Sequence, residues 1–252
     1  MTDIYFLLGG WDLEMKTISE VLDKENIPYS NAGLQWHNAN LSQYKDILNN
    51  LEGYNYVYGV ELNEDIPLPE NYVAIDHHTQ RYTENSALEQ VMAILGKQMD
   101  RLQMLVAAND KSYIPGMMNL GATAEEIEDI RFRDREAQGV TLRDEELAKI
   151  AVAENMEIVN ELIKVKALSS KFSPICDKLF PYKNLLIYTD AEWVFYGDAM
   201  MRIREMFNSE IEKGKIFFGG GAKGYIGAKQ GVYSLKELNE MIKNIEEVLR
   251  YE

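Results

Sequence analysis

The side chains best suited to chemistry in this sequence are Asp76, His77 and His78, which follow a short apolar run at residues 72–75. Carboxylate and imidazole groups both ligate divalent metals, and both transfer protons. The run is entered from a proline-bearing loop and is too short for a helix, so it predicts the end of a buried strand. A capping aspartate followed by two surface histidines is the alternative, and the triplet alone does not decide between them.

Acidic side chains also follow two earlier predicted strands. Residues 4–8 form an apolar run that stops at two glycines, and Asp12 and Glu14 come next. The strand predicted over 54–60 ends at Glu61. Because ligands of open α/β sheets bind where the strands end, we expect these acids to share one site with the histidines. Capping of the following helix is the alternative role for the first two acids.

A further acidic residue follows the next predicted helix. Residues 86–108 carry apolar side chains at helical spacing and predict one long helix with a Met and Leu stripe facing the core. Asp110 comes next, before a predicted turn at 113–116. Alone it would be a turn residue, but as one more acid in this series it is a candidate ligand. The charged segment 121–139 predicts a solvated helix face, from which an arginine could reach a substrate phosphate.

The second half of the chain predicts a smaller α/β domain. Thr141 and Asp144 have the spacing of a capping box and open a predicted amphipathic helix over 145–168. We interpret this helix as the connector between two domains. The predicted boundaries are residues 1–140, a connecting helix and linker over 141–180, and residues 181–252.

A glycine stretch follows the strand predicted near the C-terminal end. It contains Gly219, Gly220 and Gly221, with Lys223 two positions later. Consecutive glycines let backbone N–H groups approach an anion closely, and the lysine would add positive charge. A tight turn packed on the next strand is the alternative. The stretch formally matches a dinucleotide-binding pattern, but no good helix follows it directly, so we do not predict that fold.

Composition narrows the class of protein. The chain has 252 residues and a net charge of -15, which argues against a broad surface for long duplex nucleic acid but not against a small phosphorylated ligand. The single cysteine, Cys176, excludes an internal disulfide framework and fits a reducing compartment. We see neither a signal peptide nor a membrane span, and therefore expect a cytoplasmic protein. The oligomeric state is left open, with a homodimer as one option.

Taken with the glycine stretch, the Asp76-His77-His78 triplet resembles that of the DHH family of phosphoesterases. In this family a catalytic DHH domain precedes a smaller substrate-binding domain called DHHA1, and the resemblance covers most of the chain in order and spacing. It implies an α/β protein with an N-terminal parallel-sheet DHH domain, a connecting helix and a smaller C-terminal α/β domain. It also implies metal-dependent hydrolysis of a phosphoester or phosphodiester bond in a small nucleotide or short oligonucleotide.

The resemblance assigns a role to each matching residue. It implies metal ligands at Asp12, Glu14, Glu61, His77 and Asp110. It implies catalytic residues at Asp76, His77 and His78. It implies contacts to the substrate from His78, Gly219, Gly220, Gly221 and Lys223. The cofactor would be Mn²⁺, with two ions expected and one as the lesser option, and Mg²⁺ is the alternative metal.

Two departures from the family pattern bear on activity. The histidine of the first motif falls at Leu8, which cannot ligate a metal, and the histidine after the glycines is Ala222. Glu14 and Glu61 also stand where the family has aspartate. A non-hydrolytic DHH-like nucleotide-binding or regulatory protein with a degenerate site is therefore the alternative function. An acidic interaction protein that keeps a relic of the site is a third option.

Overall fold

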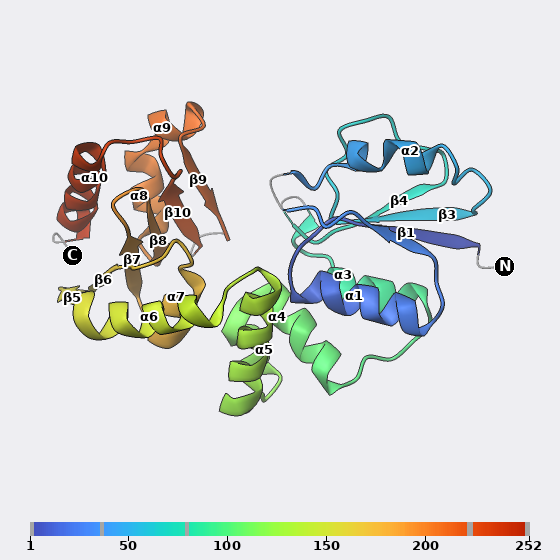
Figure 1. Cartoon of the computed structure of the whole chain (residues 1–252), viewed down its shortest axis with the longest axis horizontal. Coiled ribbons are helices and arrows are strands. Elements are labelled where there is room, and N and C mark those ends of the chain that lie inside the picture. Colours follow the sequence, from blue (N-terminus) through green and yellow to red (C-terminus); the bar gives the residue numbers. More distant parts are fainter. Residues whose placement is uncertain (1–2, 36–37, 79–80, 221–223, 250–252) are drawn as a thin grey trace. The chain divides into compact units, whose positions relative to one another are not determined.

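The computed structural model describes residues 3–35, 38–78, 81–220 and 224–249. The chain divides into two units, Met1–Gly139 and Val140–Glu252 (Figure 1). None of the helices in the described part of the chain is both long enough and apolar enough to cross a membrane.

The first unit is built on a parallel sheet of four strands in the order β2-β1-β3-β4. Its elements in chain order are β1 (Ile4–Leu8), α1 (Leu13–Lys24), β2 (Tyr29–Asn31), η2 (Leu41–Tyr44), α2 (Lys45–Leu48), β3 (Tyr56–Val60), β4 (Tyr72–Ile75), α3 (Ala87–Ile94), α4 (Arg101–Asn119) and α5 (Ala124–Ala137).

Both faces of this sheet are covered. Figure 1 shows α2 over one face, with α1 and α3 over the other. Leu7 and Val57 belong to the core on the α2 side, together with Tyr44 and Leu48. This arrangement explains why β1 is a continuous apolar run, since parallel strands between two layers have no solvent-facing side.

The single long helix predicted over 86–108 is wrong, because the structure divides the segment into α3 and α4. Gly96 adopts a φ of +64° after α3, and this left-handed conformation ends a helix readily at glycine. Each helix then has its own capping box, formed by Ser86 with Glu89 for α3 and by Asp100 with Gln103 for α4. Asp110 consequently lies within a helix and not after one.

The second unit contains a mixed sheet of six strands in the order β5-β6-β7-β8-β10-β9. Its elements are α6 (Leu142–Asn155), β5 (Met156–Val159), β6 (Leu162–Lys166), α7 (Ser173–Leu179), β7 (Asn184–Tyr188), β8 (Trp193–Gly197), α8 (Met200–Met206), α9 (Asn208–Glu212), β9 (Ile216–Gly219), β10 (Tyr225–Ala228) and α10 (Leu235–Val248). Only β6 and β7 pair in parallel among the described strands of this sheet, and the other neighbours are antiparallel.

Two apolar cores lie on opposite faces of this second sheet. Alternation along β7 separates them, because Leu186 belongs to one core and Leu185 and Ile187 to the other. The α/β class and the parallel N-terminal sheet predicted from the sequence are confirmed by this architecture.

The helix predicted over 145–168 is correct only in its first part. Thr141 caps α6 as expected, since its hydroxyl accepts from the Asp144 N–H, but the helix ends at Asn155. Residues 156–166 instead form the β5–β6 hairpin, in which Val159 pairs with Leu162. The β-branched residues of this segment and an asparagine at position 160 are sequence signals of a hairpin that the helical spacing obscured. Asn160 makes the turn in a left-handed conformation, with a φ of 56°.

Candidate metal centre

The register of the parallel sheet brings three strand ends to one edge. Leu8 pairs with Val60, and Val60 pairs with Ile75. The segments that leave the sheet after these residues therefore start side by side, where open α/β sheets bind ligands. These segments carry six of the predicted site residues, namely Asp12, Glu14, Glu61, Asp76, His77 and His78.

Glu61 leaves β3 in a left-handed backbone conformation, with a φ of 52°. Strained backbone of this kind costs about 1–3 kcal/mol for a residue other than glycine, and it is concentrated at functional sites. Gly9 makes the turn sterically feasible, because a β-carbon at this position would lie 2.4 Å from the carbonyl oxygen of Glu61. The Glu61 side chain is consequently buried at the sheet edge, beside both histidines.

Asp110 reaches the same place from α4. The helix is interrupted just after it, because Ser112 and Tyr113 have non-helical backbone angles and Tyr113 has a φ of 56°. Pro115 contributes to the interruption, since it has no backbone N–H to donate to the preceding turn. Asp110 thus occupies the last regular turn before a kink, with its carboxylate against His77.

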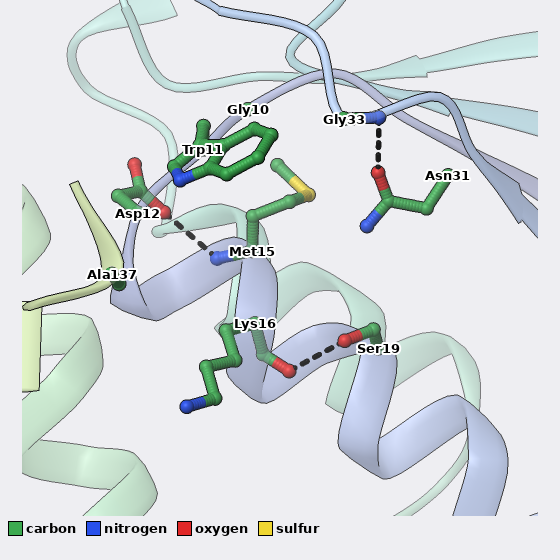
Figure 2. Close-up of a pocket in the computed structure, with 9 residues that line it drawn as sticks. All are labelled: Gly10, Trp11, Asp12, Met15, Lys16, Ser19, Asn31, Gly33 and Ala137. Carbon is green, nitrogen blue, oxygen red and sulfur yellow. Dashed lines mark hydrogen bonds between the residues drawn. The ribbon is translucent and has the colours of Figure 1, made fainter. Parts of the chain in front are cut away.

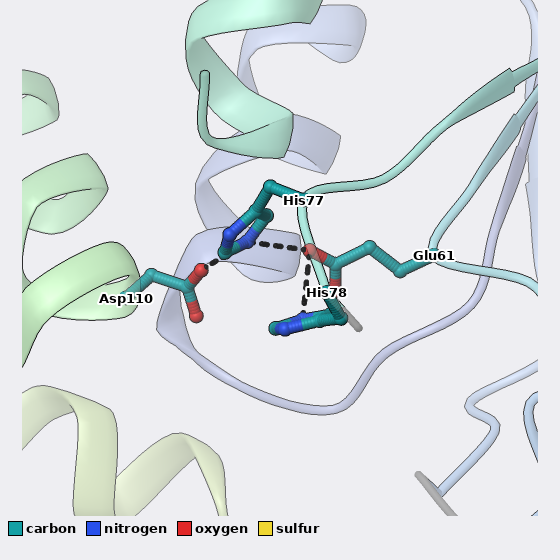
Figure 3. A group of neighbouring side chains, drawn as sticks. All are labelled: Glu61, His77, His78 and Asp110. Carbon is teal, nitrogen blue, oxygen red and sulfur yellow. Dashed lines mark ion pairs between the residues drawn. The ribbon is translucent and has the colours of Figure 1, made fainter. Parts of the chain in front are cut away.

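The Nε2 atom of His77 faces three carboxylates. It lies 2.6 Å from Asp110 Oδ2 and 3.2 Å from Glu61 Oε1. Glu14 Oε2 is 3.7 Å from the same nitrogen. Glu61 Oε1 also lies 3.4 Å from His78 Nε2, and Figure 3 shows Glu61, Asp110 and the two histidines. One ligand atom from each of Glu61, His77, His78 and Asp110 lies within 4.8 Å of the others.

These contacts are short but do not have hydrogen-bond geometry. Within the described part of the chain, buried atoms without a hydrogen-bond partner include Glu14 Oε2, both carboxylate oxygens of Glu61, His77 Nε2 and Asp110 Oδ2. A buried polar atom without a hydrogen-bond partner costs about 1–3 kcal/mol. A cluster of such atoms therefore indicates that they share a ligand that is not part of the protein chain. Carboxylate oxygen and imidazole nitrogen are suitable ligands for a divalent ion, and the donor set therefore fits such a metal.

The electrostatics of the cluster favour a bound cation. Burial raises the pKa of Glu14 to about 8 and raises the pKa of Asp12 well above its usual range, and the negative charges of Asp110 and Glu61 add to both effects. Burial alone would lower the pKa of His77, but the surrounding carboxylates outweigh it and raise this pKa to about 12. Without a metal, protons on these groups compensate the buried negative charge.

Asp12 and Asp76 lie beside the cluster, and each has a structural partner. Asp12 Oδ1 accepts from the Met15 N–H at 2.9 Å and caps α1, as the alternative interpretation of the sequence expected. Asp76 Oδ1 accepts from the His78 N–H at 2.8 Å and so shapes the loop that carries the histidines. The residues brought together at ligand distance are Glu14, Glu61, His77, His78 and Asp110.

A buried charge network behind the cluster was missed from the sequence. The segment 121–139 was predicted as a solvated face, but Arg131 and Asp134 of α5 are 8% and 5% exposed. The Nη1 atom of Arg131 donates to Asp134 Oδ2 at 2.7 Å and to Asn109 Oδ1 at 2.9 Å. Asp134 Oδ1 accepts from the Leu13 N–H at 3.3 Å. The network therefore holds the immediate chain neighbours of Asp110 and Asp12.

The described part of the glycine stretch forms a close approach between two strands. Gly219 ends β9 and pairs with Tyr225 of β10. Gly220 has a φ of +75°, and a β-carbon on Gly224 would lie 1.8 Å from the Gly219 carbonyl oxygen. These features fit the tight turn that the sequence left as an alternative. Gly221, Ala222 and Lys223 lie outside the described residues.

Solved structures are similar to this chain only at low sequence identity. The DHH domain of a member of a ribosomal protein family has a TM-score of 0.53 at 10% identity, over 97% of this chain and 86% of that one. A pGpG-specific phosphodiesterase from Vibrio cholerae has a TM-score of 0.49 at 11% identity, over 98% and 99% of the two chains. No protein-family model matches the sequence, and no curated protein matches it. The similarity to a DHH domain confirms the fold expected from the resemblance and establishes the fold alone.

Proposed function

We propose, from the DHH-type fold and the cluster at its sheet edge, that this protein is a metal-dependent hydrolase of phosphoester or phosphodiester bonds. The observation that carries the proposal is the convergence of Glu14, Glu61, His77 and Asp110 through buried atoms that lack hydrogen-bond partners. A set of buried acids around an imidazole is costly without a cation, and it lies where α/β sheets bind their ligands.

Manganese is the metal we propose. Glu14, Glu61, His77 and Asp110 would hold it. Carboxylates suit hard divalent ions, and the imidazole of His77 shifts the preference from magnesium towards manganese. A divalent ion bound there would supply Lewis acidity, lowering the pKa of a water molecule and stabilising negative charge that develops at phosphorus.

We propose His78 as the member of the cluster that meets the substrate. Its side chain is 41% exposed, whereas that of His77 is 4% exposed. The contact with Glu61 raises the pKa of His78, which favours a positive imidazolium at the open side of the cluster. The hydrogen bond from its backbone N–H to Asp76 fixes the loop that presents it. We therefore assign His78 to the substrate phosphate and Asp76 to positioning the histidine loop.

The substrate we propose is a small nucleotide or short oligonucleotide. A net charge of -15 would repel a long polyanion, whereas one or two phosphates can be neutralised locally by a metal and an imidazolium. We also retain the glycine stretch of the second unit, Gly219 to Gly221 with Lys223, as a phosphate-binding segment.

Non-hydrolytic binding of a nucleotide is the second candidate. It is favoured by Leu8, which is fully buried and apolar where the resembling family has a ligand. It is also favoured by Asp12, one of whose oxygens is used to cap α1. Both features would reduce the number of ions that the site holds.

Metal content and hydrolysis measured on the same sample test the proposal. The protein is purified in manganese, analysed for bound metal, and assayed with bis-p-nitrophenyl phosphate. Glu61→Gln removes the charge of the central carboxylate while keeping its shape. Glu20→Gln is the matched control, because it neutralises an exposed glutamate on α1.

We expect bound manganese and turnover in the unmodified protein and in Glu20→Gln, and loss of both in Glu61→Gln. Manganese that is bound without turnover would reject hydrolysis and support the nucleotide-binding alternative. Failure to retain any divalent metal would reject the metal centre itself.

A further inference from the structure

The first unit contains a pocket of about 520 Å³, whose lining residues are shown in Figure 2. Its volume falls within the range of about 300–1,000 Å³ that is typical of small-molecule sites. The residues used in the argument below are Gly10, Trp11, Asp12, Lys16, Asn31 and Gly33. We call this cavity the Trp11 pocket.

The Trp11 pocket and the metal centre share a wall. Gly10 lines the pocket, and a β-carbon on Gly10 would lie 3.6 Å from Glu61 Oε2. Asp12 also lines the pocket and caps α1, the helix that carries Glu14 of the metal centre. A ligand with a phosphate at the metal centre could therefore place its adjacent group in the pocket.

The indole of Trp11 is available for stacking. Its side chain is 49% exposed, which is unusual for the largest aromatic residue. Gly33 lies directly against one part of the ring, since a β-carbon at this position would be only 3.0 Å from Trp11 Cζ3. Gly33 has a φ of +61°, so glycine is suited to this position for its backbone conformation as well as for its size.

Polar groups accompany the ring. Asn31 Oδ1 accepts from the Gly33 N–H at 2.9 Å, and Figure 2 shows the amide nitrogen of Asn31 directed towards the pocket. Lys16 forms no ion pair with any carboxylate of the described residues. The pocket thus combines an aromatic surface, a hydrogen-bond donor and a positive charge.

We propose that the Trp11 pocket is a nucleobase subsite, in which a base stacks on Trp11 and its edge accepts a hydrogen bond from Asn31. Stacking on an aromatic side chain tolerates any base, because every base has a π-face. Lys16 adds attraction for the sugar-phosphate of the same nucleotide. The placement of the phosphate towards the metal centre rests on the function proposed above, whereas the stacking of the base does not.

Binding of guanosine 5′-monophosphate and of ribose 5-phosphate to the full-length protein tests this subsite. Ribose 5-phosphate keeps the sugar and phosphate of the nucleotide and has an anomeric hydroxyl in place of the base. Calorimetry gives both affinities without relying on activity. The variants are Trp11→Ala and, as a matched control, Tyr56→Ala. Tyr56 is an exposed aromatic residue, 51% exposed, at the opposite end of the parallel strands.

We expect Trp11→Ala to weaken the nucleotide by about 5- to 150-fold, as loss of a stacked base does. The affinity for ribose 5-phosphate should be weaker than that for the nucleotide and should not change in either variant. Equal affinities for the two ligands, or a change below twofold in Trp11→Ala, would overturn the subsite. Nucleotide binding that depends on Trp11 in a protein without hydrolytic activity would support the subsite while rejecting the hydrolase.

Discussion

The buried pair of Arg131 and Asp134 leads to a prediction about both stability and the metal centre. Arg131→Met keeps much of the length of the side chain but removes its charge and its hydrogen bonds to Asp134 and Asn109. Asp134 would remain buried, with only the Leu13 N–H and the Gln138 amide as described hydrogen-bond donors.

The expected loss is large. Removing one partner of a buried ion pair costs about 3–5 kcal/mol, because the remaining charge is left uncompensated. For a unit of this length, at about 3 °C per kcal/mol, the thermal midpoint should fall by about 9–15 °C. Adding Asp134→Asn should recover most of the loss, since the asparagine oxygen can still accept from Leu13 without carrying a charge.

Urea denaturation followed by circular dichroism measures the change, and hydrogen exchange locates it in the first unit. Arg133→Met is the matched control, because Arg133 lies on the same helix but pairs with Asp129 where both side chains are 48% exposed. An exposed pair of this kind contributes about 0.2–1 kcal/mol. A loss in Arg131→Met no larger than that in Arg133→Met would refute the argument from burial. Manganese affinity should also fall in Arg131→Met, because the network holds the neighbours of Asp110 and Asp12.

Three further predictions follow from the same unit. Adding manganese at 100 times its dissociation constant should stabilise the protein by about 2.7 kcal/mol, and thermal denaturation of His77→Ala, which loses the central ligand, should show no such shift. Gly9→Ala should destabilise the protein by about 1–3 kcal/mol and reduce its metal content, because the new β-carbon would lie 2.4 Å from the Glu61 carbonyl oxygen. Urea titration and elemental analysis measure the two effects, and a fully stable, metal-loaded variant would contradict the prediction. Glu126 accepts hydrogen bonds from the Arg101 side chain and from the Thr123 N–H, and these bonds, the first more than the second, lower its pKa to about 2. The ionised Glu126 carboxylate therefore stabilises the fold fully above pH 4.5, and this stabilisation disappears as the pH falls through 2. Urea midpoints of Glu126→Gln should therefore lie below those of the unmodified protein at pH 6 and converge with them near pH 2, and a constant difference would contradict the assignment.

The sequence was sufficient to predict that most of the groups in the cluster lie together at one edge of the sheet. Each of Glu14, Glu61 and His77 follows an apolar run that the chain must bury as a strand. Parallel strands joined by helices end at the same edge of a sheet, so local patterns imply a common location for groups far apart in the chain. Asp110 was predicted as a ligand from its place in this series of acids and from the family resemblance, although the bounds predicted for its helix were wrong.

Only the tertiary structure decided which charged residues are buried. Arg131 and Asp134 occur in a strongly charged helix, and no local pattern distinguishes them from Arg133 and Asp129 on the exposed face. Their burial depends on acceptors and donors at Asn109 and Leu13, which come from other helices.

The Trp11 pocket was also undetectable in the sequence, for the same physical reason. The pocket needs Asn31, which ends β2, and Gly33, which lies in the loop after it. A strand of only three residues is too short for its alternation of apolar and polar residues to be recognised in the sequence. The periodicity of apolar residues shows which side of each helix or strand packs against a core. Side-chain contacts between segments determine which polar groups converge, and those contacts exist only once the chain has folded.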